Sequence, residues 1–335
     1  MTIKDLAKET GYSLGTVSRV LNNHPNVSEK ARETIMEAVN RHGFILNTSA
    51  KNLKRQQSEA IACVVKGTSN GLFASMLEQI ESLFKGTKYT LVTEFLDEED
   101  NEVLRARQIC LDRKVLGIMF LGGNNRNFAE DFDKITVPSV LVTNDGKDLN
   151  FDNLSSVTTD DCAAACCIVD YLLENGHKQV ALIGGTVGSD TSCLRRDGWR
   201  LAHERRGIDE AEMAPHIPGR YSFKSGYYAM TQLLDRGVKP TAVFAMADVM
   251  AIGAISAITD RGLRVPEDIS VVGFDGIEIG EYFCPKITTI EQNVVELASR
   301  SVQMLVECIE QGAAARHETV SFSLNRRQSV KVVQG

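Results

Sequence analysis

The sequence predicts an all-α helix-turn-helix head, joined by a hinge helix to a two-lobed α/β body with parallel sheets. Three short amphipathic helices within residues 1–46 indicate the head. From Ala60 onward, β-branched apolar runs alternate with helix-length stretches, a pattern typical of buried parallel strands in βαβ units. With 335 residues, the chain is long enough for two or three domains.

The composition indicates a globular protein. Hydrophobic residues make up 43% of the chain and charged residues 24%, which excludes disordered, collagen-like and coiled-coil chains. No segment approaches the roughly 18 apolar residues of a membrane span, and the N-terminus has no apolar signal core. We therefore expect a cytoplasmic protein with no membrane partner. The eight cysteines form no CxxC pair, so we expect reduced core thiols and no metal site, with a metal site or a redox switch as the alternative. We also expect no cofactor.

The charge is distributed unevenly along the chain. Residues 1–57 contain nine basic and five acidic residues, a net charge of +4. The remainder contains 28 basic and 39 acidic residues, a net charge of −11. A basic segment on an acidic body favours a polyanion-binding module, although a net charge of +4 is also compatible with a solvated surface.

Helix signals organise the basic segment into three helices. The first is expected to begin at Thr2 and end at Gly11, the second to be capped by Ser13, and the third to run from Ser28 to Gly43. Capping side chains and terminal glycines are the usual signals of helix boundaries. Two short helices across a tight turn, backed by a third, form a helix-turn-helix.

The second helix has a polar outward face. Its outward residues are Leu14, Gly15, Thr16, Ser18 and Arg19. An arginine in this position can donate two hydrogen bonds to guanine, which is worth about 1–3 kcal/mol of discrimination between bases. The alternative is a small helical cap whose polar residues are merely solvated.

Residues 2–22, TIKDLAKETGYSLGTVSRVLN, closely resemble the signature of the lactose/galactose repressor (LacI/GalR) family of ligand-responsive bacterial transcription regulators. The resemblance continues through NVSEKARETIMEAVNRHGF (26–44) and AKNLKRQQS (50–58), and it recurs in the body in segments such as GLRVPEDISVVGFDG (262–276). It implies a DNA-binding domain over 1–46, a hinge helix over 47–58, and an effector-binding and dimerisation domain over 59–335 that is similar to periplasmic binding proteins.

The resemblance also implies which residues contact DNA. Base contacts fall on Leu14, Gly15 and Arg19. Phosphate contacts, which fix register rather than sequence, fall on Thr2, Thr16, Ser18 and Asn22. In the hinge, Leu53 would wedge between the central base pairs and kink the duplex, with Lys54 beside it. So short a helix is marginal alone, and the alternative for this segment is a flexible tether.

The body is expected to form two similar lobes, because about twelve strand-like elements exceed one comfortable sheet. The first lobe would comprise about 59–159 plus 289–318, and the second about 160–288 plus 319–335. The chain would therefore cross between lobes near Thr159, Thr288 and Glu318. Ligands bind beyond the carboxyl ends of parallel strands, which would face each other across a cleft.

Nine residues that follow strands or crossings are candidate ligand contacts. They are Leu72, Phe73, Asn144, Asp160, Thr191, Arg195, Tyr221, Asp248 and Asp275. Carboxylates accept paired hydroxyls or amines, an arginine donates parallel hydrogen bonds, and aromatic rings stack on a sugar or a base. The resemblance implies that Arg195 and Asp275 hold the ligand. Asp248 is alternatively a structural residue that caps the following helix.

These observations favour a transcriptional repressor that binds a pseudopalindromic operator as a homodimer and responds to a sugar or sugar derivative. The same architecture is compatible with a purine or a partner protein as effector, or with a small-molecule binding protein that does not regulate DNA. The sequence contains no GxxxxGK[ST], HExxH or GxSxG motif, so we do not expect an enzyme. No leucine heptad follows the last expected strand, which favours a dimer over a tetramer.

Overall fold

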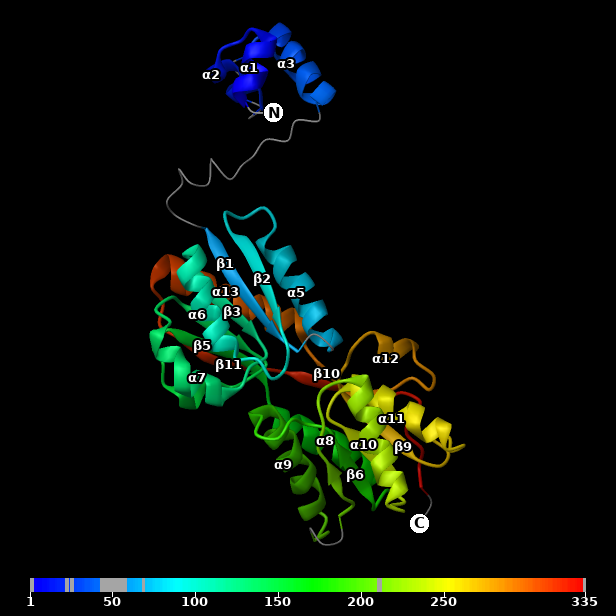
Figure 1. Cartoon of the computed structure of the whole chain (residues 1–335). Helices are drawn as coiled ribbons and strands as arrows, with labels where there is room; N and C mark the ends of the chain where they lie inside the picture. The colour runs from blue at the N-terminus through cyan, green and yellow to red at the C-terminus, as the bar shows by residue number, and fades with distance from the viewer. Residues whose placement is uncertain are drawn as a thin grey trace. The chain divides into compact units, whose positions relative to one another are not determined.

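The computed structural model describes residues 3–21, 24, 27–42, 59–67, 70–209 and 213–333. The chain divides into two compact units, Met1–Ser58 and Glu59–Gly335. Figure 1 shows the helices of the first unit in blue and the α/β elements of the second from cyan to red.

The first unit is a three-helix domain, as expected. Its helices are α1 (Ile3–Thr10), α2 (Leu14–Leu21) and α3 (Glu29–His42). Leu6, Val17 and Ile35 contribute one fully buried side chain from each helix to a common core. The hydroxyl of Ser13 accepts a hydrogen bond of 3.2 Å from the backbone N–H of Thr16 and so caps the start of α2.

The first lobe of the body contains a six-stranded parallel sheet in the order β11-β5-β4-β3-β1-β2. Its strands are β1 (Ala60–Lys66), β2 (Thr90–Leu96), β3 (Gly117–Leu121), β4 (Ser139–Val142), β5 (Leu154–Thr159) and β11 (His317–Val320). Its helices are α5 (Gly71–Phe84), α6 (Glu102–Arg113), α7 (Asn125–Asp131) and α13 (Val294–Gln311), with short 3-10 turns at Phe132–Lys134 and Lys147–Leu149.

The second lobe repeats this plan in the order β12-β10-β9-β8-β6-β7. Its strands are β6 (Val180–Ile183), β7 (His216–Ile217), β8 (Ala242–Ala245), β9 (Ser270–Asp275), β10 (Thr288–Gln292) and β12 (Phe322–Asn325). Its helices are α8 (Asp161–Glu174), α9 (Asp190–Glu204), α10 (Phe223–Asp235), α11 (Asp248–Asp260) and α12 (Ile279–Tyr282). Only β12 is antiparallel to its neighbour among these described strands.

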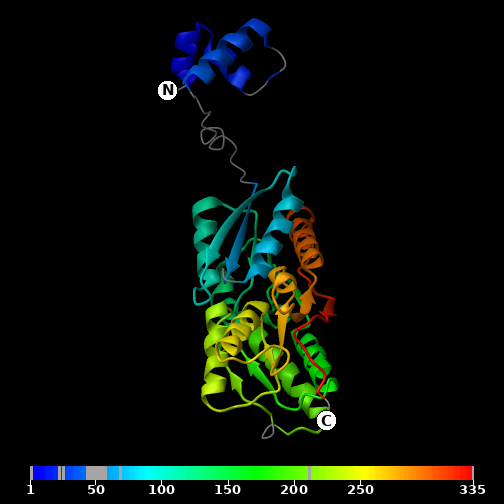
Figure 2. The ribbon, with the colours of Figure 1, turned by 90° about the vertical axis from the view of Figure 1, so that its right-hand side faces the viewer.

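Helices cover both faces of each sheet, so the central strands are buried on both sides and read as continuous apolar runs. In the first lobe, α5 and α13 pack on one face and α6 and α7 on the other (Figure 2). In the second lobe, α10 and α11 cover one face and α8 and α9 the other. In the described part of the chain, no helix has both the length and the apolar composition that a membrane span requires.

The chain passes between the lobes three times, but two crossings lie later than expected. The first follows Thr159, where it was expected. Strand β10 pairs with β9 from Thr288 to Glu291 and therefore belongs to the second lobe, so the chain returns to the first lobe after Gln292 rather than near Thr288. The last crossing lies between β11 and β12, just after Val320, rather than near Glu318.

Two glycines allow α10 and α11 to pack closely below the cleft. A Cβ atom on Gly226 would overlap with the carbonyl oxygen of Met250, and a Cβ atom on Gly253 would overlap with the carbonyl oxygen of Phe223. The two helix backbones therefore approach closely at these points. This packing supports the starts of both helices, where Tyr221 and Asp248 lie.

The substitution Gly253→Ala is expected to destabilise the second lobe by about 1–3 kcal/mol, because overpacking forces the backbones apart. Urea unfolding followed by the fluorescence of Trp199, the single tryptophan, measures this loss. Gly71→Ala is the matched control, since its Cβ would meet only Ile277 side-chain atoms at an ordinary 3.8 Å. Equal stability of the two variants would contradict the packing argument.

Candidate functional site

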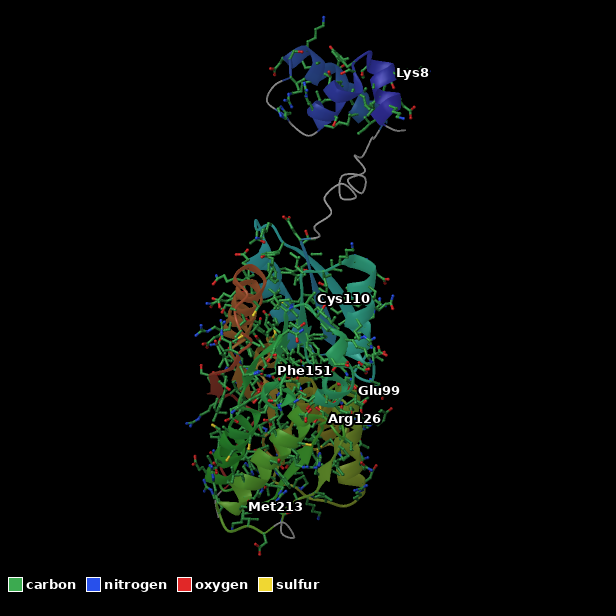
Figure 3. All side chains as sticks on the ribbon, turned by 90° about the vertical axis from the view of Figure 1, so that its left-hand side faces the viewer. Lys8, Glu99, Cys110, Arg126, Phe151 and Met213 are labelled. Carbon is green, nitrogen blue, oxygen red and sulfur yellow. The ribbon has the colours of Figure 1, made fainter. Side chains whose placement is uncertain are left out.

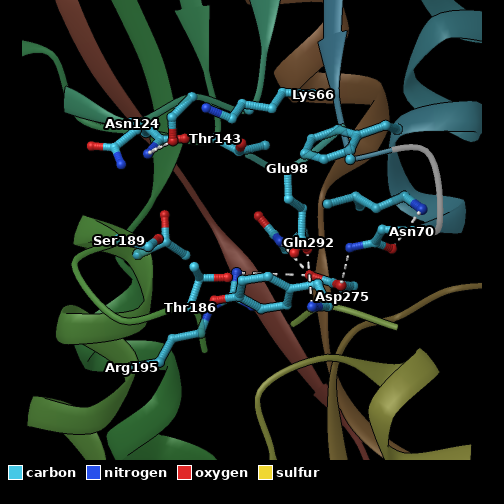
Figure 4. Close-up of a pocket in the computed structure, with 18 residues that line it drawn as sticks. Lys66, Asn70, Glu98, Asn124, Thr143, Thr186, Ser189, Arg195, Asp275 and Gln292 are labelled. Carbon is cyan, nitrogen blue, oxygen red and sulfur yellow. Dashed lines mark hydrogen bonds and ion pairs between the residues drawn. The ribbon is translucent and has the colours of Figure 1, made fainter. Parts of the chain in front are cut away.

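A pocket lies between the two lobes at the carboxyl ends of their strands. It encloses about 740 Å³ of empty space, part of which is open to solvent. Figure 4 shows Lys66, Asn124 and Thr143 on the side of the first lobe, opposite Ser189 and Arg195 of the second. Seven of the nine expected ligand residues line this pocket: Leu72, Phe73, Asn144, Thr191, Arg195, Tyr221 and Asp275.

Arg195 on α9 forms the buried floor of the pocket and is only 4% exposed. Its Nε donates to Asp161 Oδ1 at 2.7 Å and its Nη1 donates to the carbonyl oxygen of Met246 at 2.5 Å. The guanidinium carbon also lies 3.7 Å from the ring centroid of Phe274. Burial raises the pKa of Asp161 to about 6, and the charge of Arg195 opposes that rise.

Asp275 presents the carboxylate of the site. It ends β9 with a φ of 108°, a conformation that is strained for a residue other than glycine. Its Oδ2 accepts from Asn70 Nδ2 and its Oδ1 from Gln292 Nε2, each at 2.8 Å. Arg195 Nη2 lies 3.7 Å from Oδ1. Burial raises the pKa of Asp275, and Arg195 opposes the rise.

Lys66 brings a cation to the opposite wall, and that cation is already paired. Its Nζ lies 2.5 Å from Glu102 Oε2, and Glu102 is fully buried. The other oxygen of Glu102 accepts from the backbone N–H of Asn124 at 2.6 Å. Glu102 therefore holds both Lys66 and the start of α7 at the edge of the pocket.

Two of the expected ligand residues do not line the pocket. Asp160 caps α8, because its side chain accepts from the backbone N–H of Ala163 at 2.9 Å. Asp248 is fully buried behind the pocket and accepts from Thr289 Oγ1 at 2.6 Å and from the backbone N–H of Ile277 at 2.9 Å. These two hydrogen bonds join β10 to the loop after β9.

Sequence reasoning missed several lining residues, although a signal existed for some of them. The polar ones are Lys66, Asn70, Glu98, Asn124, Thr143, Thr186, Ser189 and Gln292. Lys66 and Gln292 are the last residues of β1 and β10, and Thr143 directly follows β4, so the strand-end rule points to these three. The others lie in loops whose course depends on tertiary packing.

In the first unit, α2 presents the expected contact face. Leu14, Gly15 and Arg19 are exposed, and Thr16 and Ser18 are half-buried beside them. Val17 and Val20 are buried on the opposite face. The expected DNA contacts Thr2, Asn22, Leu53 and Lys54 lie outside the described residues.

Burial raises the pKa of Asp248 to about 8, and the negative charge of Asp275 is the second cause of the rise. The folded protein therefore holds a proton here that the unfolded chain releases near pH 4. The contribution of protonated Asp248 to the free energy of unfolding is fully present below about pH 4 and is lost as the pH rises to about 8. Thr289 Oγ1 donates to Asp248 when the carboxylate is ionised. When Asp248 is protonated, the hydroxyl can instead donate to the carbonyl oxygen of Ile290, 3.2 Å away, and accept from the acid.

In the wild type, titration of Asp248 can lower the free energy of unfolding by up to about 1.4 kcal/mol per pH unit between pH 5 and pH 8. We expect Asp248→Asn to remove this contribution, so that stability declines less over that range. The asparagine amide can donate to Thr289 and accept from Ile277, as the protonated acid does. Urea unfolding at both pH values measures the difference. Asp160→Asn, at an exposed position, should keep the wild-type slope, and an unchanged slope in Asp248→Asn would refute the assignment.

Comparisons with known proteins agree with both units. The family model described as bacterial regulatory proteins, lacI family, matches residues 2–47. The model described as a periplasmic binding protein-like domain matches residues 169–330. Among solved structures, the lac repressor dimer bound to operator and the anti-inducer ONPF superposes with a TM-score of 0.76 and 28% identity, over 99% of each chain.

Curated relatives cover nearly the whole chain. The HTH-type transcriptional regulator MalR of Clostridium butyricum is 34% identical, over 98% of this chain and 99% of that protein. The HTH-type transcriptional repressor PurR of Histophilus somni is 30% identical over 99% of both. These relatives are transcriptional regulators and not enzymes. The chain therefore belongs to the lacI family of DNA-binding bacterial transcriptional regulators.

Proposed function

We propose that this protein is a cytoplasmic repressor that binds a pseudopalindromic operator as a homodimer and is controlled by a neutral saccharide in the pocket between its lobes. The observation that carries the choice of effector is that each charged side chain on the described wall of the pocket already has a partner of opposite charge within the protein.

On the described wall of the pocket the pairings leave no cation for an anionic ligand, because Arg195 already serves both Asp161 and Asp275. Lys66 is paired with Glu102 and Arg195 with Asp161. The two acidic lining residues are paired as well: Glu98 Oε2 lies 3.1 Å from Arg220 Nε, and Asp275 lies close to Arg195. A phosphate or carboxylate would lose its hydration without gaining an unpaired cation, which is costly in a partly buried site.

The remaining polar groups suit hydroxyl-rich ligands. They are amides and hydroxyls of Asn124, Thr143, Asn144, Thr186, Ser189 and Thr191. Amides and hydroxyls both donate and accept hydrogen bonds, as sugar hydroxyls do. Phe73 and Tyr221 add aromatic faces to the wall, which supports stacking on a sugar and keeps a purine as the second candidate. Cellobiose, the ligand named for the similar regulator CelR (25% identity, TM-score 0.71), is a neutral saccharide.

Operator binding is supported by α2 and by the relatives. Arg19 is exposed on α2, and the similar lac repressor structure is a dimer bound to operator. Two-fold symmetric dimers bind pseudopalindromic sites because each half-site receives one recognition helix. The second lobe also exposes the apolar side chains of Ile279 and Tyr282 on α12 and Tyr228 on α10, which are suited to a dimer contact. A monomer in sedimentation equilibrium would contradict this part of the proposal.

A thermal-shift screen should identify a stabilising ligand among neutral pentoses, hexoses and disaccharides. A ligand at 100 times its dissociation constant adds about 2.7 kcal/mol to the free energy of unfolding, which raises the Tm measurably. Asp275→Asn should abolish the shift, because one of its acceptor oxygens becomes a donor. Asp160→Asn should retain it, since Asp160 does not line the pocket. A shift with sugar phosphates alone, or with purines alone, would refute the neutral saccharide.

Arg19→Ala should weaken specific operator binding by about 10- to 100-fold, as expected for loss of about 1–3 kcal/mol of base discrimination. Binding to scrambled DNA should change much less. Arg41→Ala is the control for charge: it removes one cation from α3, where Arg41 pairs with Glu9 at 3.4 Å. Fluorescence anisotropy at several salt concentrations measures both affinities. Equal losses on operator and scrambled DNA in Arg19→Ala would contradict base contact by Arg19.

A further inference from the structure

Besides the hydrogen bond of 3.0 Å from Thr159 Oγ1 to Gln292 Oε1 at the ends of β5 and β10, three sets of hydrogen bonds between described residues join the lobes across the pocket. Asn70 of the first lobe donates to Asp275 of the second, as described above. The backbone N–H of Asn125 donates to Asp190 Oδ2 at 3.1 Å, and neither of these two residues lines the pocket. The third set is made by Glu98, which lies in the loop between β2 and α6.

Glu98 uses both carboxylate oxygens to hold the opposite lobe. Its Oε2 accepts from Arg220 Nε at 3.1 Å, and its Oε1 accepts from the backbone N–H of Tyr221 at 2.9 Å. Its side chain is 17% exposed and forms part of the pocket wall. The hydrogen bond that Arg220 donates to Glu98 is also the main cause of the raised pKa of Arg220. Glu98 therefore combines a cross-lobe ion pair with a place in the pocket.

The contact with Tyr221 fixes a ligand-facing ring. Tyr221 is held at its backbone by Glu98 and at its hydroxyl by Ser192, 2.9 Å away. Its ring centroid lies 5.9 Å from the guanidinium carbon of Arg195. The ring of Tyr221 is thus positioned from one end by its own lobe and from the other end by the first lobe.

We propose that Glu98 is a positioning residue that latches the two lobes in the closed arrangement and sets the place of Tyr221 in the pocket wall before any effector binds. The effector must compete with Asn70 for Asp275, whereas the bonds of Glu98 to Arg220 and the Tyr221 backbone can remain intact. The significance of this latch for effector control rests on the function proposed above.

The neighbouring residue Glu99 provides a control that distinguishes the specific hydrogen bonds of Glu98 from a general attraction between charges. Glu99 Oε1 also lies 3.4 Å from Arg220 Nη1, but its side chain is 77% exposed. Figure 3 shows Glu99 near the level at which the two lobes meet. Exposed ion pairs contribute little because solvent screens them. Glu99 therefore has the same charge as Glu98 and the same ion-pair partner, Arg220, but it does not line the pocket.

Hydrogen–deuterium exchange on the full chain, without DNA and without effector, tests the latch at the amide of Tyr221. Glu98→Ala removes the acceptor and the ion pair, so exchange of this amide should accelerate about tenfold or more, as for loss of one hydrogen bond to a charged group. Arg220→Ala keeps the acceptor and should accelerate exchange less. Glu99→Ala should exchange like the wild type.

Unchanged exchange at Tyr221 in Glu98→Ala would overturn the proposal, and so would equal acceleration in Glu98→Ala and Glu99→Ala. Thermal unfolding shows whether each variant is folded. If Glu98→Ala is not, Glu98→Gln replaces it: loss of the ion pair with a weaker acceptor should accelerate exchange about threefold, and a wild-type rate would overturn the proposal. Because neither DNA nor effector is present, this test can fail while the proposed function stands, and the reverse also holds.

Discussion

The pocket depends on one buried cation. Arg195 joins α9 to Asp161 at the start of α8, to the carbonyl oxygen of Met246 after β8, and to Asp275 at the end of β9. Burying a guanidinium is unfavourable unless its hydrogen bonds and charge are compensated. The carboxylates, the carbonyl and the ring of Phe274 provide that compensation, and in doing so they bring the ends of separate elements to one point. Removing Arg195 would leave two buried carboxylates without their counter-ion.

The same compensation decides what the pocket offers to a ligand. Arg195 is committed to protein groups on several sides, and Lys66 is committed to Glu102. Cations that are neutralised in this way act as rigid parts of the wall rather than as anchors for an anion. Under the proposed function, selectivity then depends on the geometry of the neutral donors and acceptors, which can discriminate ligands by the position of their hydroxyl groups.

Much of the fold could be predicted because its signals are local. The runs at 61–65, 139–144 and 270–276 are apolar and rich in β-branched residues since those strands are buried on both faces, and the structure confirms a strand in each.

The crossing near Thr288 was placed too early because TTIEQ carries no signal for the sheet that it joins; its pairing with β9 is a tertiary property. Asp160 and Asp248 were chosen for their places after strands, but that rule cannot tell a side chain that faces the cleft from one that turns back into the protein. Glu98 lies in an acidic stretch whose composition is typical of a solvated loop. Its contacts with Arg220 and Tyr221 depend on the position of the other lobe, which the local sequence does not indicate.

The interleaved crossings have a consequence for biosynthesis. The sheet of the first lobe is completed by β11, and one of its faces is covered by α13, yet both elements emerge more than 130 residues after Thr159. When synthesis has reached the end of β10, the first lobe still has one apolar face that only α5 covers, and a strand edge that is unpaired. Exposed surfaces of this kind favour aggregation until the missing elements arrive. The body can therefore acquire its stable form only after α13 and β11 have been synthesised, and chains released before that point would fold poorly and be exposed to proteolysis.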